Sequence, residues 1–399
     1  MIIGIDASRA NVKQKSGTEL VAYNLIQEIK KIADPRDRFI LYSKEPLRGP
    51  LADLPPNFTN RVLHWPPRYI WTQLRLSWEM LTRAPDILFV PAHTIPIIHP
   101  KKTYTVLHDI GFEYYADLYS KQRIGYSVPF GRSVLNLFVR LFTFGKYGAN
   151  EIDYHRWSAL FAIRHATKII TVSEFSRQAI LKRYPVNPKK VITLHNAFNF
   201  DFYHLPDQSS IIPVLAKYKL HQPYLLFIGR LELKKNIPNL IKAFAFLKKN
   251  FHYPGSLVLI GKPGFGFEDA KRTITENELT KFVLLPGWIE SEDIPKIMNG
   301  AEVFVFPSQY EGFGMPILEA MNCGIPVITS NRGALAEIAG QAAALVNPDD
   351  ISDIATTIHQ VVTRPAFKSD LIQKGYARSA QFSWAKAALE YMDILTQRK

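Results

Sequence analysis

The chain is poor in cysteine and has no long hydrophobic run. Its 399 residues include one cysteine, Cys323, which cannot form an internal disulfide. This excludes a disulfide-stapled secreted domain and favours a reducing compartment. No apolar stretch approaches the roughly 18 residues of a membrane-spanning helix, and the first residues, interrupted by Asp6, do not resemble a signal peptide. We therefore expect a cytoplasmic protein, at most peripheral on the inner face of a membrane.

Acidic residues are scarce in the first half of the chain. Residues 1–200 carry 28 lysines and arginines against 15 aspartates and glutamates, whereas residues 201–399 carry 21 against 20. Nearly all of the net charge of +14 therefore lies in the first half. This indicates an anionic partner there, and nucleic acid, an anionic membrane and a phosphorylated acceptor all fit. A surface that serves solubility alone is the simpler alternative. We disfavour nucleic acid, because no recognition helix, zinc module or aromatic platform is recognisable.

Short apolar runs alternate with segments of helical periodicity through almost the whole chain. This alternation predicts an α/β fold with parallel sheets, and the length suits two domains. A polar stretch with prolines, residues 201–223, separates two such series. We expect an N-terminal domain over residues 1–205, onto which a C-terminal helix, 381–399, packs back, and a second domain over residues 206–380. The predicted strands are 2–6, 39–43, 60–64, 86–90, 103–108, 168–172 and 191–194, then 224–228, 257–260, 282–285, 303–306, 326–329 and 343–346.

The most specific pattern directly follows the predicted strand 303–306. Residues 307–320 are Pro-Ser-Gln-Tyr-Glu-Gly-Phe-Gly-Met-Pro-Ile-Leu-Glu-Ala. Gly312 and Gly314 allow a sharp turn and a close approach to a ligand, and Pro316 suits the first turn of a helix. The N–H groups at such a helix start suit anionic or hydroxyl oxygens.

Two carboxylates flank this turn. Glu311 lies in the loop and Glu319 about one turn inside the predicted helix. Both can accept hydrogen bonds from sugar or ribose hydroxyls. Alternatively, Glu319 only faces the helix dipole and Glu311 is solvated. The two glycines and the proline between them favour a ligand site.

A second pattern, residues 228–236, follows the predicted strand 224–228 and contains Gly-Arg-Leu and Lys-Asn. The Arg230 guanidinium can hold two oxygens of a diphosphate, and the Lys235 ammonium can hold another. Such cations are usually solvated when they occur alone, but beside the two glutamates they indicate a diphosphate clamp. The sequence shows no His/Cys cluster with ligand spacing and no Asp-x-Asp, so we expect no metal ion.

Together these residues resemble the retaining glycosyltransferases of family 4. That family has the GT-B fold, in which two Rossmann-like domains with parallel sheets face each other across a cleft. Gly-Arg-Leu followed by Lys-Asn, with two glutamates separated by seven residues, is similar to the family's donor-site signature. Residues 107–110 (Leu-His-Asp-Ile), 172–176 (Val-Ser-Glu-Phe-Ser) and 287–288 (Gly-Trp) also look like family positions. The combination is most similar to bacterial mannosyltransferases that build surface polysaccharides.

The resemblance implies a role for each matching residue. Arg230 and Lys235 would bind the donor diphosphate, Glu319 the ribose, and Glu311 the hydroxyls of the transferred sugar. Arg230, Lys235 and Glu311, with His108, would form the catalytic set. The donor-binding set would be Gly17, Arg230, Lys235, Gly312, Phe313, Gly314, Met315 and Glu319.

Two of these residues come from the first half of the chain. His108 matches the family's histidine that faces the reacting sugar, whereas without the resemblance a satisfied loop histidine is the preferred interpretation. Gly17 matches a glycine that approaches the donor phosphates. The family often has two adjacent glycines there, and this chain has only Ser16-Gly17.

The expected function is transfer of a hexose, with mannose favoured, to a lipid-linked or polysaccharide acceptor. The donor would be a nucleotide-diphosphate sugar, with GDP-mannose favoured, and the anomeric configuration would be retained. We expect no cofactor and no metal. The alternatives are another GT-B enzyme (a different hexosyltransferase, a phosphorylase or an epimerase) and a non-enzymatic, basic nucleic-acid-binding protein.

Residues 120–148 combine cations with aromatic and aliphatic residues and contain no acidic residue. Such a segment can lie in a bilayer interface with its cations on lipid phosphates. An ordinary buried helix is the alternative, because sequence does not distinguish burial in protein from burial in lipid. The cations are Lys121, Arg123, Arg132, Arg140 and Lys146.

We predict that the chain floats with anionic vesicles at low salt and much less with neutral ones. Each surface cation contributes on the order of 1 kcal/mol on an anionic leaflet, so changing Arg132, Arg140 and Lys146 together to Gln should reduce flotation strongly. Undiminished flotation of the triple variant would show that segment 120–148 is not the membrane contact.

Overall fold

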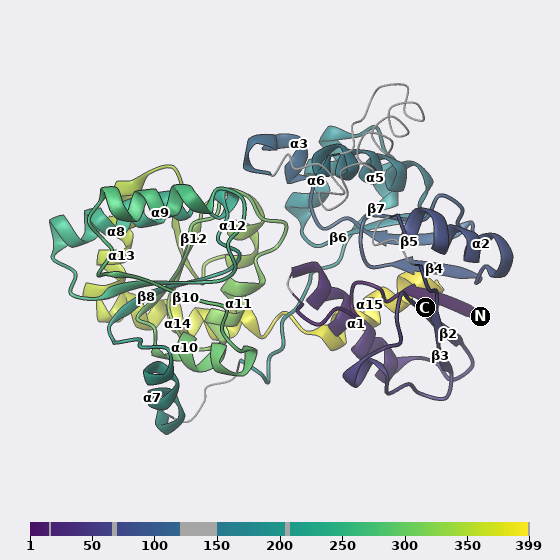
Figure 1. Cartoon of the computed structure of the whole chain (residues 1–399), viewed down its shortest axis with the longest axis horizontal. Helices are drawn as coiled ribbons and strands as arrows, with labels where there is room; N and C mark the ends of the chain where they lie inside the picture. Colours follow the sequence, from purple (N-terminus) through teal and green to yellow (C-terminus); the bar gives the residue numbers. More distant parts are fainter. Residues whose placement is uncertain (16, 66–69, 120–149, 204–207, 398–399) are drawn as a thin grey trace. The chain divides into compact units, whose positions relative to one another are not determined.

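The computed structural model describes residues 1–15, 17–65, 70–119, 150–203 and 208–397 (Figure 1). These residues form two compact units, the first made of Met1–Ala197 with Trp384–Lys399 and the second of Phe198–Ser383. Each unit contains a parallel sheet covered by helices, so the predicted α/β fold with two such domains is confirmed. Segment 120–148, predicted to contact lipid, and Ser16 lie outside the described residues.

The first sheet has the strand order β3-β2-β1-β4-β5-β6-β7, and its described pairings are all parallel. The order reverses at β1, and sheets of this kind bind ligands at the carboxyl ends of the strands beside such a reversal. A strand lies at every predicted place, although β3 begins at Phe58, whose ring stacks on Phe39 of β2 at 4.4 Å. The strands are β1 (Ile2–Asp6), β2 (Arg38–Ser43), β3 (Phe58–Val62), β4 (Ile87–Val90), β5 (Lys102–Val106), β6 (Lys168–Thr171) and β7 (Val191–Thr193).

Helices cover both faces of this sheet. Leu88 and Val90 of β4 share one core cluster with residues of α2, α5 and α6. Phe89 lies between them and therefore points to the opposite face, where its ring lies 5.5 Å from that of Tyr391 in α15. Helix α15 packs on α1. The helical segments are α1 (Gly17–Ile32), η1 (Gly49–Leu51), η2 (Thr72–Leu76), α2 (Ser77–Arg83), α3 (Gly111–Tyr114), η3 (Ala116–Leu118), α5 (Glu151–His165), α6 (Glu174–Arg183), η4 (Pro188–Lys190) and α15 (Trp384–Thr396).

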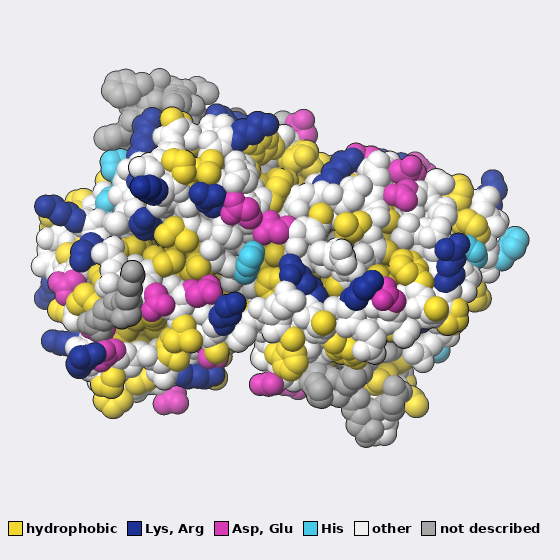
Figure 2. All heavy atoms as spheres, turned by 180° about the vertical axis from the view of Figure 1, so that it is seen from behind, with side chains coloured by type: hydrophobic (Ala, Val, Ile, Leu, Met, Phe, Trp, Pro, Cys, Tyr) yellow, Lys and Arg dark blue, Asp and Glu magenta, His cyan; other side chains and the backbone are white. Residues whose placement is uncertain are grey.

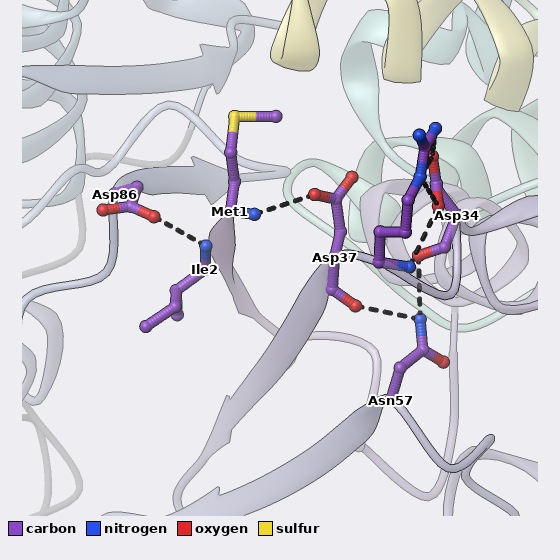
Figure 3. A network of polar contacts seen from close by, with 7 residues as sticks. Met1, Ile2, Asp34, Asp37, Asn57 and Asp86 are labelled. Atoms are coloured by element: carbon purple, nitrogen blue, oxygen red, sulfur yellow. Dashed lines mark hydrogen bonds and ion pairs between the residues drawn. The ribbon is translucent and has the colours of Figure 1, made fainter.

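A polar network holds the amino ends of the first four strands (Figure 3). The Met1 amino group lies 2.9 Å from the Asp37 carboxylate, and the Ile2 amide donates to Asp86 at 2.7 Å. The Asn57 side chain donates to the Asp37 carbonyl oxygen at 3.1 Å. These contacts fix the strands at their amino ends. Ligands bind at the opposite edge of such a sheet, at the carboxyl ends of the strands.

The second sheet has the order β10-β9-β8-β11-β12-β13 and is also parallel in its described pairings. Its order reverses at β8, so the carboxyl ends of β8 and β11 are the expected place for a ligand. Each strand lies where the sequence predicted one. They are β8 (Tyr224–Ile228), β9 (Ser256–Ile260), β10 (Val283–Gly287), β11 (Val303–Phe306), β12 (Val327–Ser330) and β13 (Ala344–Val346).

Helices also cover both faces of the second sheet, with α8, α9 and α13 on one side and α10 and α14 on the other (Figure 1). In the part of the chain that the structure describes, no helix is long and apolar enough to span a membrane. The helical segments are α7 (Gln208–Lys217), η5 (Leu233–Lys235), α8 (Ile237–Phe251), α9 (Phe267–Glu276), η6 (Ser291–Asp293), α10 (Ile294–Gly300), α11 (Met315–Asn322), α12 (Gly333–Ala339), α13 (Ile351–Thr363) and α14 (Pro365–Ser379).

Helix α7 corrects the sequence-based interpretation of residues 201–223 as a polar connection. Ile211, Val214 and Leu215 are buried, and α7 packs against α10. These three residues have helical spacing, so one apolar face forms despite Pro213 within the helix. The surrounding serines and prolines concealed that short face.

Candidate active site

The loop between β11 and α11 has the sharp turn that the sequence predicts. Gly314 precedes the helix with φ 102°, and a Cβ atom there would lie 2.5 Å from a methyl carbon of Leu335. Gly312 does not share this positive φ. Both the backbone angle and the space therefore require glycine at 314. Phe313 is buried against Phe382 with ring centroids 5.7 Å apart, and this contact holds the loop on its own domain.

The structure brings Lys235 and Glu311 together. The Lys235 ammonium forms an ion pair with a Glu311 carboxylate oxygen, and the two side chains are only 14% and 12% exposed. The same ammonium lies 5.1 Å from the ring centroid of Phe306, the last residue of β11. Two residues 76 positions apart thus meet at the carboxyl ends of neighbouring strands β8 and β11.

Arg230 has a different environment. Its side chain is 66% exposed, and its Nε lies 3.7 Å from Glu232, beyond hydrogen-bonding distance. The guanidinium is therefore on the surface of the same loop and can reorient at small cost.

Asn236, to which the sequence pattern gave no role, holds the two loops together. Its backbone is left-handed, with φ 62°, which asparagine tolerates better than most residues. Its buried side-chain amide donates to the carbonyl oxygens of Pro307 at 3.1 Å and Pro348 at 2.6 Å. It therefore ties the loops after β8, β11 and β13 to one another. Its place beside Lys235 in the motif was the available signal.

Glu319 lies in α11, and the described polar partner of its half-buried carboxyl is the Tyr203 hydroxyl. Burial raises the pKa of Glu319 to about 7, and the hydrogen bond from Tyr203 opposes that rise. Tyr203 is held in turn beside α11, because Asn322 donates to the Phe200 carbonyl at 2.9 Å and the Cys323 thiol lies 3.4 Å from the Tyr203 carbonyl oxygen. Tyr203 is a second residue that sequence reasoning missed.

In the first unit, His108 lies two residues beyond the end of β5, whereas the sequence predicted it as the last residue of that strand. Its Nε2 lies 3.3 Å from the Pro91 carbonyl oxygen, and its own carbonyl accepts a hydrogen bond from Ser176 at 3.2 Å. Burial lowers the pKa of His108 to about 4, which the Pro91 carbonyl opposes. The ring is therefore neutral near pH 7, and with Nε2–H directed to Pro91 its Nδ1 is an acceptor.

Three further residues of the first unit gather near His108 and were missed. His93 follows β4, and its Nε2 lies 2.9 Å from Nδ1 of His155. Burial lowers the pKa of His93, and its electrostatic interactions with His155, Arg9 and His108 lower it further. Arg9 follows β1. β1, β4 and β5 are neighbours in the sheet, so the position of Arg9 and His93 shortly after two of these strands was the available signal.

Gly17 begins α1 with φ 39°. A Cβ there would meet no atom within 4 Å, so the backbone angle, not crowding, favours glycine. Among the described residues, no group of three or more His, Cys, Asp or Glu could hold a metal ion.

Comparison with known proteins gives one family match, which covers residues 214–378 and is described as glycosyl transferases group 1. The chain is 32% identical over 249 residues to O-antigen chain mannosyltransferase B of Escherichia coli, a match that covers 62% of this chain and 65% of that protein. It is 31% identical over 242 residues to the serotype-specific mannosyltransferase WbdA of Escherichia coli, covering 60% of this chain and 30% of that protein. The matches therefore span less than two thirds of either relative.

Several solved structures resemble the whole chain, and two of them show the extent of the likeness. The crystal structure of Anabaena Alr3699/HepE in complex with UDP and glucose has a TM-score of 0.70 at 18% identity, covering 100% of this chain and 99% of that chain. The structure of WaaG, a glycosyltransferase involved in lipopolysaccharide biosynthesis, has a TM-score of 0.73 at 13% identity and covers 100% of both chains. At these identities the likeness concerns the fold.

The raised pKa of Glu319 predicts a pH-dependent stability. The pKa is about 7 in the folded protein against an ordinary 4.5. Between these two pH values the folded state therefore binds more protons than the unfolded state, and the free energy of unfolding falls as the pH rises. Glu319→Gln removes this loss and should raise the melting temperature at about pH 8 by several degrees. Thermal melts across this range measure the effect.

The matched control is Glu268→Gln, on the surface of the same unit, where the carboxylate is 81% exposed. It should follow the pH dependence of the wild type. If the melting temperature of the Glu319→Gln variant changes with pH in the same way as that of the wild type, this carboxyl titrates with an ordinary pKa.

Proposed function

We propose that this chain, which has the GT-B fold and whose second unit is a glycosyl transferase group 1 domain, is a retaining mannosyltransferase that needs no metal. The resemblance to GT-B glycosyltransferases, and to mannosyltransferases among them, is confirmed. The donor would be a nucleotide-diphosphate sugar, GDP-mannose in the first instance, and the acceptor a lipid-linked or polysaccharide glycan. The observation that carries the proposal is the Lys235–Glu311 pair at the carboxyl ends of β8 and β11.

The pair suits an exchange of partners when the donor binds. A diphosphate oxygen can replace the Glu311 carboxylate beside the Lys235 ammonium, so that the cation keeps a negative partner. Glu311 is then available to accept hydrogen bonds from hydroxyls of the transferred sugar. The low exposure of both side chains makes these interactions stronger than they would be in water.

Arg230 would supply the second cation of the clamp. Its exposed guanidinium has two N–H groups in a fork that match two diphosphate oxygens. As the glycosidic bond breaks, negative charge grows on the leaving diphosphate. Cations already in place stabilise that charge in the transition state more than in the ground state, which is what increases the rate.

Glu319 would bind the ribose of the nucleotide. Its carboxyl is held by Tyr203 and half-buried, so ribose hydroxyls can replace water as donors to it. With a pKa of about 7, the carboxylate form is lost as the pH falls below neutrality, and binding through it should weaken there.

The resemblance assigns His108 to the reacting sugar. A neutral imidazole with an acceptor Nδ1 suits a sugar hydroxyl, and a pKa of about 4 keeps it in this state over the working range of pH. In the front-face mechanism that the resemblance implies, the departing diphosphate assists deprotonation of the acceptor hydroxyl, so His108 need not act as a base.

We predict that Arg230→Ala and Lys235→Ala each lower the transfer rate by about 100-fold or more, because each removes a charge that stabilises the leaving diphosphate. Steady-state transfer of sugar from a nucleotide-sugar donor measures this. Lys242→Ala, an exposed lysine of α8, is the control and should leave the rate unchanged. A rate within about threefold of the wild type for either clamp variant contradicts its assignment.

The two glutamates should separate binding from chemistry. Glu319→Gln should mainly weaken binding of the free nucleoside diphosphate, since Glu319 would bind the ribose. Glu311→Gln should mainly slow transfer, since Glu311 would contact the sugar that moves. Titration calorimetry with the nucleoside diphosphate, beside single-turnover transfer, distinguishes them. An equal loss of nucleotide affinity in both variants would reject the distinction.

A further inference from the structure

The first unit carries an apolar surface that its own fold does not use. Helix η2 continues into α2, and three of their residues are exposed: Leu74 is 47%, Trp78 62% and Leu81 59% exposed. Trp78 and Leu81, three residues apart, lie on one face of α2, and Leu74 lies in the π-helical segment η2 that precedes it. The opposite face is already in the core, where Leu76 and Met80 are buried.

The loop after β4 extends this surface. The Ile98 amide donates to the Ser77 hydroxyl at 3.3 Å, and the Gln73 side chain donates to the Ile95 carbonyl oxygen at 3.4 Å. These contacts hold the loop beside the helix. Ile97 and Ile98 are themselves exposed. We call the surface made of Leu74, Trp78, Leu81, Ile97 and Ile98 the α2 face.

Cations outnumber exposed acidic residues around the α2 face. Within residues 70–84 and 93–105 the acidic residue is Glu79, which is buried and paired with Arg61 at 3.0 Å and Arg75 at 3.2 Å. The exposed charged residues of these two segments are Arg83, Lys101 and Lys102. The exposed acidic residue nearest in sequence is Asp86, which accepts a hydrogen bond from the Ile2 amide. The side of the molecule that Figure 2 shows has lysines and arginines between surface hydrophobic side chains, with acidic side chains among them.

We propose that the α2 face docks onto an anionic lipid bilayer, with Trp78 and Leu81 in the interface and Arg83, Lys101 and Lys102 on lipid phosphates. A helix with exposed Trp and Leu on one stripe and cations at its border has the composition of interfacial membrane helices. The excess of 28 basic over 15 acidic residues in residues 1–200 adds a long-range attraction to the same leaflet.

The charge pattern disfavours a second copy of the chain as the occupant. A symmetric contact brings the same patch of both copies together. It would place Arg83, Lys101 and Lys102 of one copy near those of the other, and like charges across an interface are destabilising. A bilayer with anionic phosphates has the complementary sign.

The proposal is tested by cosedimentation of the full chain with vesicles of phosphatidylcholine and phosphatidylglycerol. We expect the wild type to bind. The double variant Trp78→Ser, Leu81→Ser should bind the vesicles at least about tenfold more weakly at both low and high salt, because it loses the buried apolar contact. Lys101→Gln with Lys102→Gln should lose roughly tenfold at low salt, and much less at high salt. Binding requires no donor or acceptor, so this test is independent of the proposed transferase activity.

Leu389→Ser is the matched control. Leu389 is an exposed leucine of α15, the helix that packs on the opposite face of the same sheet, so this variant should bind as the wild type does. Trp78→Phe provides a second readout that keeps the apolar contact. It should bind normally, yet lose the fluorescence quenching that bromine-labelled lipids cause in the wild type.

Three results would overturn the proposal. The first is that the Trp78, Leu81 double variant binds vesicles as strongly as the wild type. If the triple variant of segment 120–148 then fails to bind, the membrane contact belongs to that segment. The second is a wild-type dimer in solution that the double variant converts to a monomer, which would make the α2 face a contact between copies. The third is undiminished quenching in Trp78→Phe.

Discussion

The ion pair between Lys235 and Glu311 is the contact on which the site of the second unit depends. Both side chains are nearly buried, and a buried charge without a partner costs several kcal/mol. The loops after β8 and β11 must therefore lie where the two charges meet. The parallel pairing of β8 with β11 brings the loops to one edge, and the bonds from Asn236 to Pro307 and Pro348 fix their separation. A site held in this way is preorganised for a ligand that carries both negative charge and hydroxyl groups.

Glu319, unlike the Lys235–Glu311 pair, lies in an environment that lowers the stability of the fold when its carboxyl is charged. Its environment disfavours the charged form, as the pKa of about 7 indicates, so at neutral pH and above the fold bears a cost for keeping this carboxylate. Such costs are typical of residues whose role is outside folding. Tyr203 reduces the cost through its hydrogen bond and belongs to the segment that runs along α11. The carboxyl thus depends on a residue more than 100 positions away in the chain.

The sheets were the most predictable part of the fold. Each strand is a short apolar run between loop signals, and burial on both faces of a parallel sheet leaves a pattern that local sequence carries. The exceptions have nonlocal causes. Phe58 joins β3 because it stacks on Phe39, and α7 forms because a short apolar face finds α10. Neither Phe39 nor α10 is near in sequence, so local periodicity could not include their effect.

The sequence by itself determined which residues of the site can carry charge and where each leaves its strand. Gly314 could be recognised because its backbone angle, φ 102°, is a local requirement of the turn before α11. Only the tertiary structure decided which side chains meet. It paired Lys235 with Glu311, gave Asn236 its two carbonyl partners, placed Tyr203 on Glu319, and gathered Arg9 and His93 near His108 through the order of β1, β4 and β5. It also left Trp78 and Leu81 exposed, although their sequence suits a buried helix equally well. The physical reason is that backbone angles and hydrophobic periodicity act between neighbours along the chain, whereas ion pairing, burial and exposure depend on which distant segments the fold brings together.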